Sequence, residues 1–411
     1  MKKTILILGA GEEQAIAIKL AQNMGIRVIA VDGNPKAVGL KIADVGIYAD
    51  IKDTDKMLSI AKKYKVNGVM THAVEIPQIV AKIAENLGLP GIRREVAERA
   101  TNKLKRIICF KKNGIPHPNF KTARTIKEAE QKSEKIGFPV VVKPIDNAGS
   151  RGVIKVNTRK EIRKAFSEAK SFSKKNIILI EKYLEGPEIS TESVIYKKKI
   201  YTPCWADRNY SKKELYYPYM IEDGGDLPTV LSKKNKELVE KTVKMAIKAL
   251  GINFGAAKGD ILIHRGTPYI IEMAARTSGG RFCDTKVPLS NGVNILKPLI
   301  NMHVGNKINP TELKPKYELG VSERTIIPEP GKIISIRGIK KAQKMTGVYK
   351  IYMKPEIKIG GYVRPIRNHA NKVGYIVAIG NTQKTAVEIA ERAVKLIKIK
   401  TVDKKRHQHK N

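Results

Sequence analysis

Apolar and polar positions alternate in blocks over the first hundred residues. Short continuous apolar runs are typical of strands buried on both faces of a parallel sheet, and the segments between them have apolar positions at helical spacing. Runs and helical segments follow one another at residues 4–9, 12–25, 27–32, 53–65, 66–72 and 75–88. This β-α-β-α-β order predicts an open, doubly wound α/β sheet.

The loop after the first predicted strand carries part of a dinucleotide-binding fingerprint. Gly9 and Gly11 match it, Gln14 stands at the third glycine position, and Asp32 ends the second strand, where an acidic residue can meet a ribose. A nicotinamide or flavin site is one interpretation. A Rossmann-like scaffold that serves another ligand is favoured, because two glycines alone are a weak match.

His72 and Glu75 lie where the third predicted strand gives way to a helix. The carboxyl ends of strands in an open α/β sheet are a usual binding edge. A role in capping or packing the following helix is the favoured interpretation.

The pattern changes after about residue 116, where strands and helices become segregated. Residues 93–113 predict one or two helices, and residues 233–251 predict a helix with one apolar face that includes Leu238, Val239 and Ile247. Residues 257–276 predict two strands joined by the polar turn HRGTP. From about residue 310 the chain predicts a small β-rich module closed by one helix. We therefore expect an α/β part followed by an α+β part.

Composition narrows the classes of function. The 411 residues carry a formal charge of +39, with lysines spread over the whole length. A solvated basic surface is favoured over a dedicated nucleic-acid face, and its field would attract anionic small molecules such as nucleotides. No apolar stretch is long enough to span a bilayer, and the apolar run at the N-terminus is too short for a signal peptide. The basic tail, residues 404–411, is expected to be disordered.

The cysteines favour a reducing compartment. Cys109, Cys204 and Cys283 lie far apart, so neither a disulfide framework nor a structural zinc site is indicated. A cytoplasmic location is the expectation.

A loop with small side chains follows Lys143. Lys143 ends the apolar run FPVVVKP, and Gly149, Ser150 and Gly152 leave backbone N–H groups open to an anion. Phosphate binding and an ordinary β-turn explain this loop equally well when it is taken alone.

A second candidate segment is IEKYLEGPEIS. Glu181 ends a strand, so Lys182, Tyr183 and Leu184 can offer backbone groups to a purine, and Glu188 can accept hydrogen bonds from ribose hydroxyls. Two solvated glutamates at strand ends are the alternative.

Two carboxylates flank the HRGTP turn. Asp260 and Glu272 lie on the two predicted antiparallel strands, which would bring both side chains to one face. Such an oxygen-rich pair suits Mg²⁺ with nucleotide phosphates. Arg276, four residues after Glu272, would place a guanidinium near a transferred phosphoryl group.

The order and spacing of these features resemble the ATP-grasp superfamily. The features are a lysine, a glycine loop, a hinge at a strand edge, a carboxylate pair and an arginine. ILGAGEEQ, EMAARTSGG and the C-terminal segments PGKIISIRG and GYIVAIGNTQKTA are similar to the L-amino-acid ligase type, with features shared with the carbamoyl-phosphate synthase and biotin carboxylase branch. The resemblance implies a Rossmann-like pre-ATP-grasp domain at 1–110, an ATP-grasp domain at 111–308 and a C-terminal β-rich module with a closing helix and basic tail at 309–411.

The resemblance also implies roles for single residues. Lys143 looks like one lysine that contacts ATP phosphates. Lys103 looks like the earlier one, and Lys105 is the alternative to Lys103. Residues 181–184 resemble the adenine hinge, Glu188 the ribose contact, and Asp260 and Glu272 the ligands of Mg²⁺, with Mn²⁺ as an alternative. Ala274 stands where many members have a third metal ligand, asparagine. The segment YYPYMIEDGGDLP lacks a histidine that some dipeptide-forming members use, and DRNYSKK (207–213) is either a second lid or a plain loop.

The implied function is an ATP-dependent carboxylate–amine ligase that forms an acyl phosphate, ADP and phosphate from a small carboxylate such as an amino acid. Arg276 and Lys143 would carry the catalysis. The alternatives are a bicarbonate-phosphorylating carboxylase or carbamoyl-type enzyme, a nucleotide-binding protein without turnover, and a nicotinamide oxidoreductase. The expected partners are small carboxylates and amines, not nucleic acid or membrane, and a homodimer is compatible with the resemblance.

Overall fold

The computed structural model describes residues 2–402, so the expectation for the tail at 404–411 lies outside the described residues. The chain forms a mixed α/β fold with several sheets, as predicted, and divides into two compact units. Unit 1 comprises Met1–His117, Ile189–Trp205 and Leu231–Tyr317. Unit 2 comprises Pro118–Glu188, Ala206–Val230 and Glu318–Asn411.

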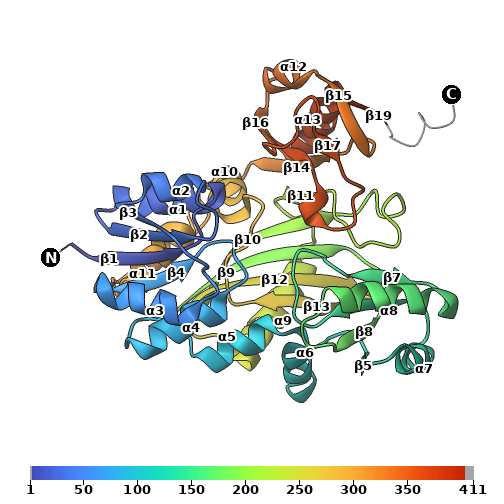
Figure 1. The fold of residues 1–411 in the computed structure, drawn as a ribbon, viewed down its shortest axis with the longest axis horizontal. Coiled ribbons are helices and arrows are strands. Elements are labelled where there is room, and N and C mark those ends of the chain that lie inside the picture. Colours follow the sequence, from blue (N-terminus) through green and yellow to red (C-terminus); the bar gives the residue numbers. More distant parts are fainter. Residues whose placement is uncertain (1, 403–411) are drawn as a thin grey trace. The chain divides into compact units, whose positions relative to one another are not determined.

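Unit 1 begins with a parallel sheet of strand order β3-β2-β1-β4. Its strands are β1 (Thr4–Leu8), β2 (Arg27–Asp32), β3 (Val45–Tyr48) and β4 (Gly68–Thr71), and its helices are α1 (Glu12–Asn23), α2 (Val38–Ile42), α3 (Thr54–Lys63) and α4 (Pro77–Asn86). Alternate residues of β1 enter different cores: Ile5 and Ile7 pack with α1, whereas Leu6 and Leu8 pack with α3 and α4. Figure 1 shows α1 on one side of this sheet and α3 and α4 on the other. Both faces of the sheet are therefore buried, as its continuous apolar runs predict.

The rest of unit 1 is antiparallel, with neighbouring strands in the order β13-β12-β9-β10. The strands are β9 (Glu188–Tyr196), β10 (Lys199–Asn209), β12 (Gly255–His264) and β13 (Thr267–Ala274). The helices are α5 (Arg94–Thr101), α6 (Lys103–Lys112), α9 (Lys233–Leu250), α10 (Val287–Asn291) and α11 (Leu296–His303), with short turns at Phe282–Lys286 and Pro310–Leu313. One correction concerns α9, where Val239 and Ile247 are fully buried but Leu238 is 36% exposed and lies outside the apolar face.

Unit 2 contains an antiparallel sheet of order β5-β8-β6-β7 that is covered by two helices. The strands are β5 (Phe120–Ala123), β6 (Val140–Pro144), β7 (Ile154–Val156) and β8 (Ile178–Lys182), and the helices are α7 (Ile126–Ile136) and α8 (Ile162–Ser171), preceded by a turn at Arg159–Glu161. Ala129 of α7 and Phe166 of α8 pack on Val142 and Ile180 of the sheet.

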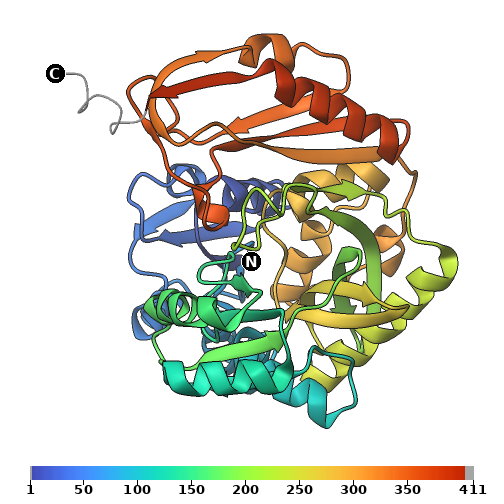
Figure 2. The same cartoon turned by 90° about the vertical axis from the view of Figure 1, so that its right-hand side faces the viewer.

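The C-terminal part of unit 2 has two further groups of strands. β11 (Gly224–Leu227), β14 (Gly320–Ile326), β18 (Gly374–Gly380) and β16 (Val348–Met353) are neighbours in that order, and β15 (Gly331–Arg337) pairs with β17 (Tyr362–Val363) and β19 (Lys398–Val402). The helices are α12 (Ile339–Gln343) and α13 (Gln383–Leu396), with a turn at His369–Asn371. Figure 2 shows α13 lying along β14 and β18. The predicted closing helix is thus α13, but β19 follows it.

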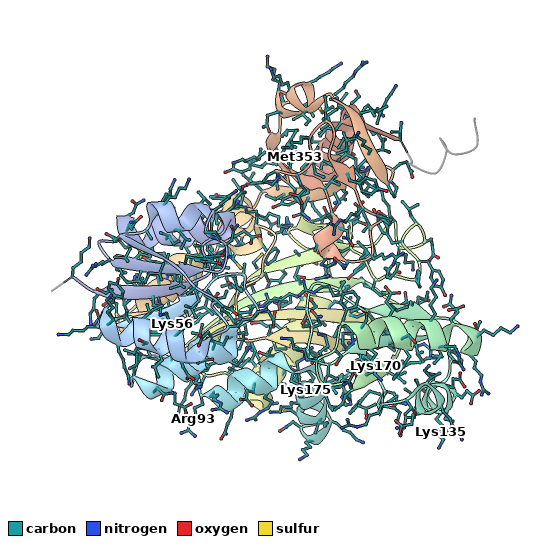
Figure 3. The ribbon with its side chains drawn as sticks, viewed as in Figure 1. Lys56, Arg93, Lys135, Lys170, Lys175 and Met353 are labelled. Atoms are coloured by element: carbon teal, nitrogen blue, oxygen red, sulfur yellow. The ribbon has the colours of Figure 1, made fainter. Side chains whose placement is uncertain are left out.

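The excess of positive charge lies on the surface of both units. Lys56 and Arg93 in unit 1, and Lys135, Lys170 and Lys175 in unit 2, are all exposed (Figure 3). Within residues 2–402, no helix combines the length and the apolar character that crossing a bilayer requires.

Candidate active site

The two predicted metal ligands face each other in unit 1. Asp260 of β12 pairs directly with Glu272 of β13, so both side chains lie on one face of the hairpin. The register shifts immediately after Asp260. Asp260 is 4% exposed, and the hydroxyl of Ser190 on β9 donates to its Oδ1 at 2.8 Å.

A third charged residue, Lys258, was missed in the sequence. Its Nζ lies 2.5 Å from Oδ2 of Asp260 and 3.3 Å from Oε2 of Glu272. The signal was present in AKGD, because residues two apart on a strand share a face. The ammonium contacts both carboxylates, so one cation can reach oxygens of both residues at this position.

Glu272 is held in its ionised form. Burial alone would raise the pKa of its carboxyl group, but the charges of Lys258, Arg106 and Lys103 outweigh burial and keep this pKa well below its usual range. Lys105 instead pairs with Glu98 at 3.0 Å. Of the two rival lysines, Lys103 is therefore the one whose charge acts on Glu272.

Arg276 follows β13 and forms an ion pair with Glu75. Burial would lower the pKa of its guanidinium, but the carboxylates of Glu75 and Glu272 raise it. The helix-capping interpretation of Glu75 is wrong, because α4 begins after Ile76 without a side-chain cap. Glu75 is an ion-pair partner instead, and His72 is fully buried.

Glu192 is a second residue that sequence reasoning missed. It lies two residues after Ser190 on β9, and is fully buried. Its Oε2 accepts the N–H of Ser278 at 3.1 Å, while Oε1 has no hydrogen-bond partner among the described residues. Burial raises the pKa of this carboxyl group, against opposing interactions with Ser278, Cys283 and Arg276. Glu192 is thus a buried acid near Arg276, with one carboxylate oxygen that accepts no hydrogen bond from the described residues.

A small cavity of about 50 Å³ opens beside Arg276 in unit 1. Its wall is mostly apolar, and includes Met70, Val80, Phe254 and Leu299. A space of this size holds a small apolar group or a few water molecules.

The candidate phosphate lysine of unit 2 is paired. Lys143 of β6 lies close to Glu181 of β8, with Nζ 2.6 Å from Oε2, and both side chains are 7% exposed. The two residues were assigned separate roles in the sequence, 38 positions apart. The pairing of β6 with β8 brings them together.

The loop after Lys143 has the backbone that its composition predicts. Gly149, Ser150 and Gly152 have φ values of 66°, 58° and 69°, a left-handed region that favours glycine. A Cβ at Gly152 would lie 3.0 Å from Phe172, so packing also requires glycine there. His369 was missed in the sequence: its N–H donates to the carbonyl of Gly149 at 3.2 Å, and its Nε2 lies 3.3 Å from Oγ of Ser150.

The segment predicted to bind adenine has fewer free backbone N–H groups than expected. The N–H of Lys182 donates to Asn119 at 2.8 Å, and that of Tyr183 donates to Pro139 at 3.1 Å. Two of the backbone donors that the sequence offered to a purine are therefore used within unit 2. The Lys182 ammonium bonds the carbonyls of Gly137 and Phe138.

Glu188 is held by a network at the start of β9. Nε of Arg208 lies 2.9 Å from its Oε1, and the hydroxyl of Tyr210 donates to the same oxygen at 3.3 Å. Arg208 also pairs with Glu222 at 2.5 Å. The predicted lid at 207–213 is therefore partly wrong, because its first three residues belong to strand β10.

The partial dinucleotide fingerprint is used within the scaffold. Asp32 accepts the N–H of Ala10 at 2.6 Å with Oδ2 and that of Asn34 at 2.7 Å with Oδ1. Gln14 donates to the carbonyl of His72 at 2.6 Å. These bonds hold the loop itself, which favours the scaffold interpretation over a nicotinamide site.

Comparisons with known proteins show which chains resemble this one. Residues 109–278 match the family model "D-ala D-ala ligase C-terminus", and residues 324–402 match "L-amino acid ligase C-terminal domain 2". An uncharacterized protein of Sinorhizobium fredii is 25% identical over 82% of this chain and 69% of its own length. The carbamoyl phosphate synthase large chain of Clostridium botulinum is 26% identical over 84% of this chain, which spans only 31% of that protein.

Solved structures share the fold over almost the whole chain. The L-amino acid ligase from Bacillus licheniformis has a TM-score of 0.84 at 21% identity, covering 98% of this chain and 99% of that one. Phosphoribosylglycinamide synthetase from Anaerococcus prevotii has a TM-score of 0.74 at 23% identity, covering 98% and 100%. By fold and by family match, the chain is similar to L-amino acid ligases, and in sequence it is also similar to the large chain of carbamoyl phosphate synthase.

Proposed function

We propose that this protein is an ATP-dependent ligase that joins a small carboxylate, such as an amino acid, to an amine. The observation that carries the proposal is the pair of facing carboxylates Asp260 and Glu272, which both contact one cation, the Lys258 ammonium. Arg276 follows Glu272 by four residues. The fit to Mg²⁺ rests on the donor set, because paired ionised carboxylates are the ligands that this ion prefers.

The proposed roles follow the two units. In unit 1, Asp260 and Glu272 would hold Mg²⁺, with Mn²⁺ as an alternative, and Lys103 would contact phosphate. In unit 2, the proposed nucleotide contacts are Lys143, Gly149, Ser150 and Gly152 for phosphates, Glu181, Lys182, Tyr183 and Leu184 for adenine, and Glu188 for ribose. Since Lys143 is paired with Glu181, it would act on phosphate while sharing its charge with that carboxylate.

ATP supplies the phosphoryl group. An oxygen of the substrate carboxylate attacks the γ-phosphorus and ADP leaves; an amine nitrogen then attacks the acyl carbon and inorganic phosphate leaves. Arg276 and Lys143 would neutralise the charge on the transferred group, so positioning and electrostatics provide the catalysis. The cavity beside Arg276 supports a substrate with a small apolar side chain.

The wider proposals follow the same assignment. We propose the layout of a Rossmann-like domain at 1–110, an ATP-grasp domain at 111–308 and a β-rich module at 309–411. A cytoplasmic location is proposed because the three cysteines are free and buried. A homodimer is compatible with one structural neighbour, the dimeric biotin carboxylase domain of the 2-oxoglutarate carboxylase from Hydrogenobacter thermophilus.

The test is Mg²⁺-dependent release of ADP and phosphate, measured with pairs of amino acids, other small carboxylates with amines, and bicarbonate. We expect stimulation by a carboxylate together with an amine, largest for small apolar amino acids, and loss of at least a hundredfold in Glu272→Gln and Lys143→Ala. Glu237→Gln and Lys121→Ala, both at exposed positions, are the matched controls.

Each other outcome selects an alternative. Stimulation by bicarbonate alone would assign the protein to the carboxylase type. Binding of Mg·ATP without turnover on any pair would favour a nucleotide-binding protein. Turnover that survives in Glu272→Gln would remove the proposed metal site.

A further inference from the structure

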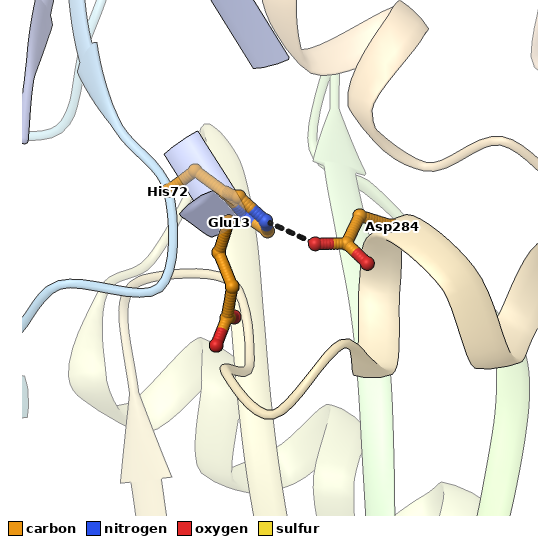
Figure 4. A group of neighbouring side chains, drawn as sticks. All are labelled: Glu13, His72 and Asp284. Atoms are coloured by element: carbon orange, nitrogen blue, oxygen red, sulfur yellow. Dashed lines mark hydrogen bonds and ion pairs between the residues drawn. The ribbon is translucent and has the colours of Figure 1, made fainter. Parts of the chain in front are cut away.

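A buried histidine lies near two carboxylates in unit 1, and none of the three was assigned a role in the proposed ligase. His72 follows β4, Glu13 lies in the first turn of α1 after β1, and Asp284 lies in the turn Phe282–Lys286 (Figure 4). Because β1 and β4 are neighbouring parallel strands, Glu13 and His72 come from the same carboxyl edge of the sheet, where ligands commonly bind.

The donor atoms are close and differ in kind. One imidazole nitrogen and two carboxylate oxygens all lie within 4.8 Å of one another. Both His72 and Asp284 have fully buried side chains, with 3.3 Å between Nε2 and Oδ2. This separation is long for a charge-assisted N–H···O bond, which is about 2.7–2.9 Å. For this one pair, the separation agrees with the edge of a tetrahedral zinc site, where ligand atoms about 2.0–2.1 Å from the ion lie about 3.4 Å apart.

The groups behind these donors fix their orientation. Nδ1 of His72 lies 2.8 Å from Oγ1 of Thr277, which also accepts the N–H of Ala73 at 3.1 Å. In the tautomer with the proton on Nδ1, this N–H donates to Thr277 and the lone pair of Nε2 points toward the Asp284 carboxylate, as metal binding needs; in the other tautomer Nε2–H donates to Asp284. A metal-binding histidine characteristically donates its other N–H to an oxygen in this way. The N–H of Gly280 orients Glu13 by donating to it at 3.2 Å.

The local charges favour a divalent ion. Arg281 lies nearer to Glu12, at 3.3 Å, than to Asp284, at 3.7 Å. One guanidinium thus lies near several carboxylates, since Arg281 pairs with both Glu12 and Asp284 and its backbone N–H donates to Glu13 at 3.5 Å. A divalent cation between these carboxylates would offset their mutual repulsion.

We propose that Glu13, His72 and Asp284 bind a divalent transition-metal ion of the Zn²⁺ type, at a site separate from Asp260 and Glu272. An imidazole with two carboxylates suits Zn²⁺ and similar ions, whereas Mg²⁺ takes oxygen ligands. Thr277 directly follows Arg276, so the ion would fix the segment that carries this arginine. It is a positioning site, and its occupancy does not depend on the ligase assignment.

Zinc binding is measured by equilibrium dialysis and elemental analysis, on tag-free full-length protein with excess Mg²⁺ present. The background variant carries His407→Asn and His409→Asn, which removes the imidazoles of the tail. We expect one Zn²⁺ per chain, and a dissociation constant raised at least tenfold in His72→Gln, Asp284→Asn and Glu13→Gln. Co²⁺ in place of Zn²⁺ should give a visible d–d absorption band that these variants lose.

Glu272→Gln is the matched control and should bind Zn²⁺ like the background protein. Glu13→Gln provides a usable measurement if the variants at the two fully buried positions fail to fold. No bound Zn²⁺ in the background protein would overturn the proposal, and so would equal affinity in Glu13→Gln and any folded variant at the other two positions. In either case the contact between His72 and Asp284 is bridged by a proton.

Discussion

At the scale of single residues, the Lys258 ammonium neutralises two carboxylates at once. Lys258→Met would leave Asp260 and Glu272 facing each other as like charges. We expect the free energy of unfolding without Mg²⁺ to fall by about 2–4 kcal/mol, because removing one partner leaves largely buried charge uncompensated. Mg²⁺ should then raise the melting temperature more in the variant than in the wild type.

Urea unfolding with and without Mg²⁺ measures both effects. Lys121→Met, at an exposed position, is the control and should change little. Equal Mg²⁺ responses in the wild type and in Lys258→Met would contradict a metal role for this carboxylate pair.

Glu192 gives a prediction about pH. Burial raises the pKa of its carboxyl group in the folded state above the usual value of 4.5. Such a group contributes stability that is present below its unfolded-state pKa and is lost as pH rises through the folded-state value. The glutamine in Glu192→Gln cannot ionise. We therefore expect the melting temperature of the variant to increase relative to that of the wild type as pH rises above about 4.5. Thermal melts across this range measure the difference, and Glu237→Gln should show no such trend. A constant difference would mean that Glu192 stays ionised.

Contacts between residues close in the sequence could be predicted, whereas contacts between distant residues could not. The Asp260–Glu272 pair could be predicted because both residues belong to one hairpin, in which strand period and turn determine the register. The pair Lys143–Glu181 could not, because it depends on the contact between β6 and β8. In the sequence, Glu192 looks like any other strand residue, and only its burial in the structure sets it apart from an exposed glutamate.

At the scale of elements, α9 tests the correction to its apolar face. Ile247 is fully buried, so Ile247→Ala should lower the free energy of unfolding by about 2–5 kcal/mol through lost contacts and a cavity. Leu238 is 36% exposed, and Leu238→Ala should cost under about 1 kcal/mol. Urea unfolding of the two variants measures this contrast, and similar losses would mean that Leu238 packs in the core.

Boundaries of elements were predictable where a local signal existed. Asn102 divides residues 93–113 into α5 and α6, because its side chain accepts the N–H groups of Leu104 and Lys105. Strand β3 was missed because its four residues alternate between half-buried and exposed, as at a sheet edge, and give no apolar run. The order of strands within the sheets is a long-range property that periodicity does not contain.

At the scale of the whole molecule, the compact units do not follow the order of the chain. Unit 1 and unit 2 each use three separate stretches, and β10 begins in one unit and ends in the other. A reading along the sequence predicts contiguous segments, because it sees composition and period but not which strands pair. The general architecture was accessible through family resemblance, since the motifs spread over the chain occur in a characteristic order.

The formal charge of +39 provides a last prediction for the whole molecule. Exposed basic residues occur in both units, at positions such as Lys56, Arg93, Lys135 and Lys170, so the charge is distributed over the surface. A diffuse surface of this kind should bind duplex DNA only through counterion release, which weakens steeply as salt rises. Fluorescence anisotropy with unrelated duplexes should show binding at low ionic strength that is independent of sequence and absent at physiological salt. Binding that persists there, and that differs between sequences, would instead require a dedicated nucleic-acid face, because only base contacts or DNA shape can discriminate once the electrostatic contribution is screened.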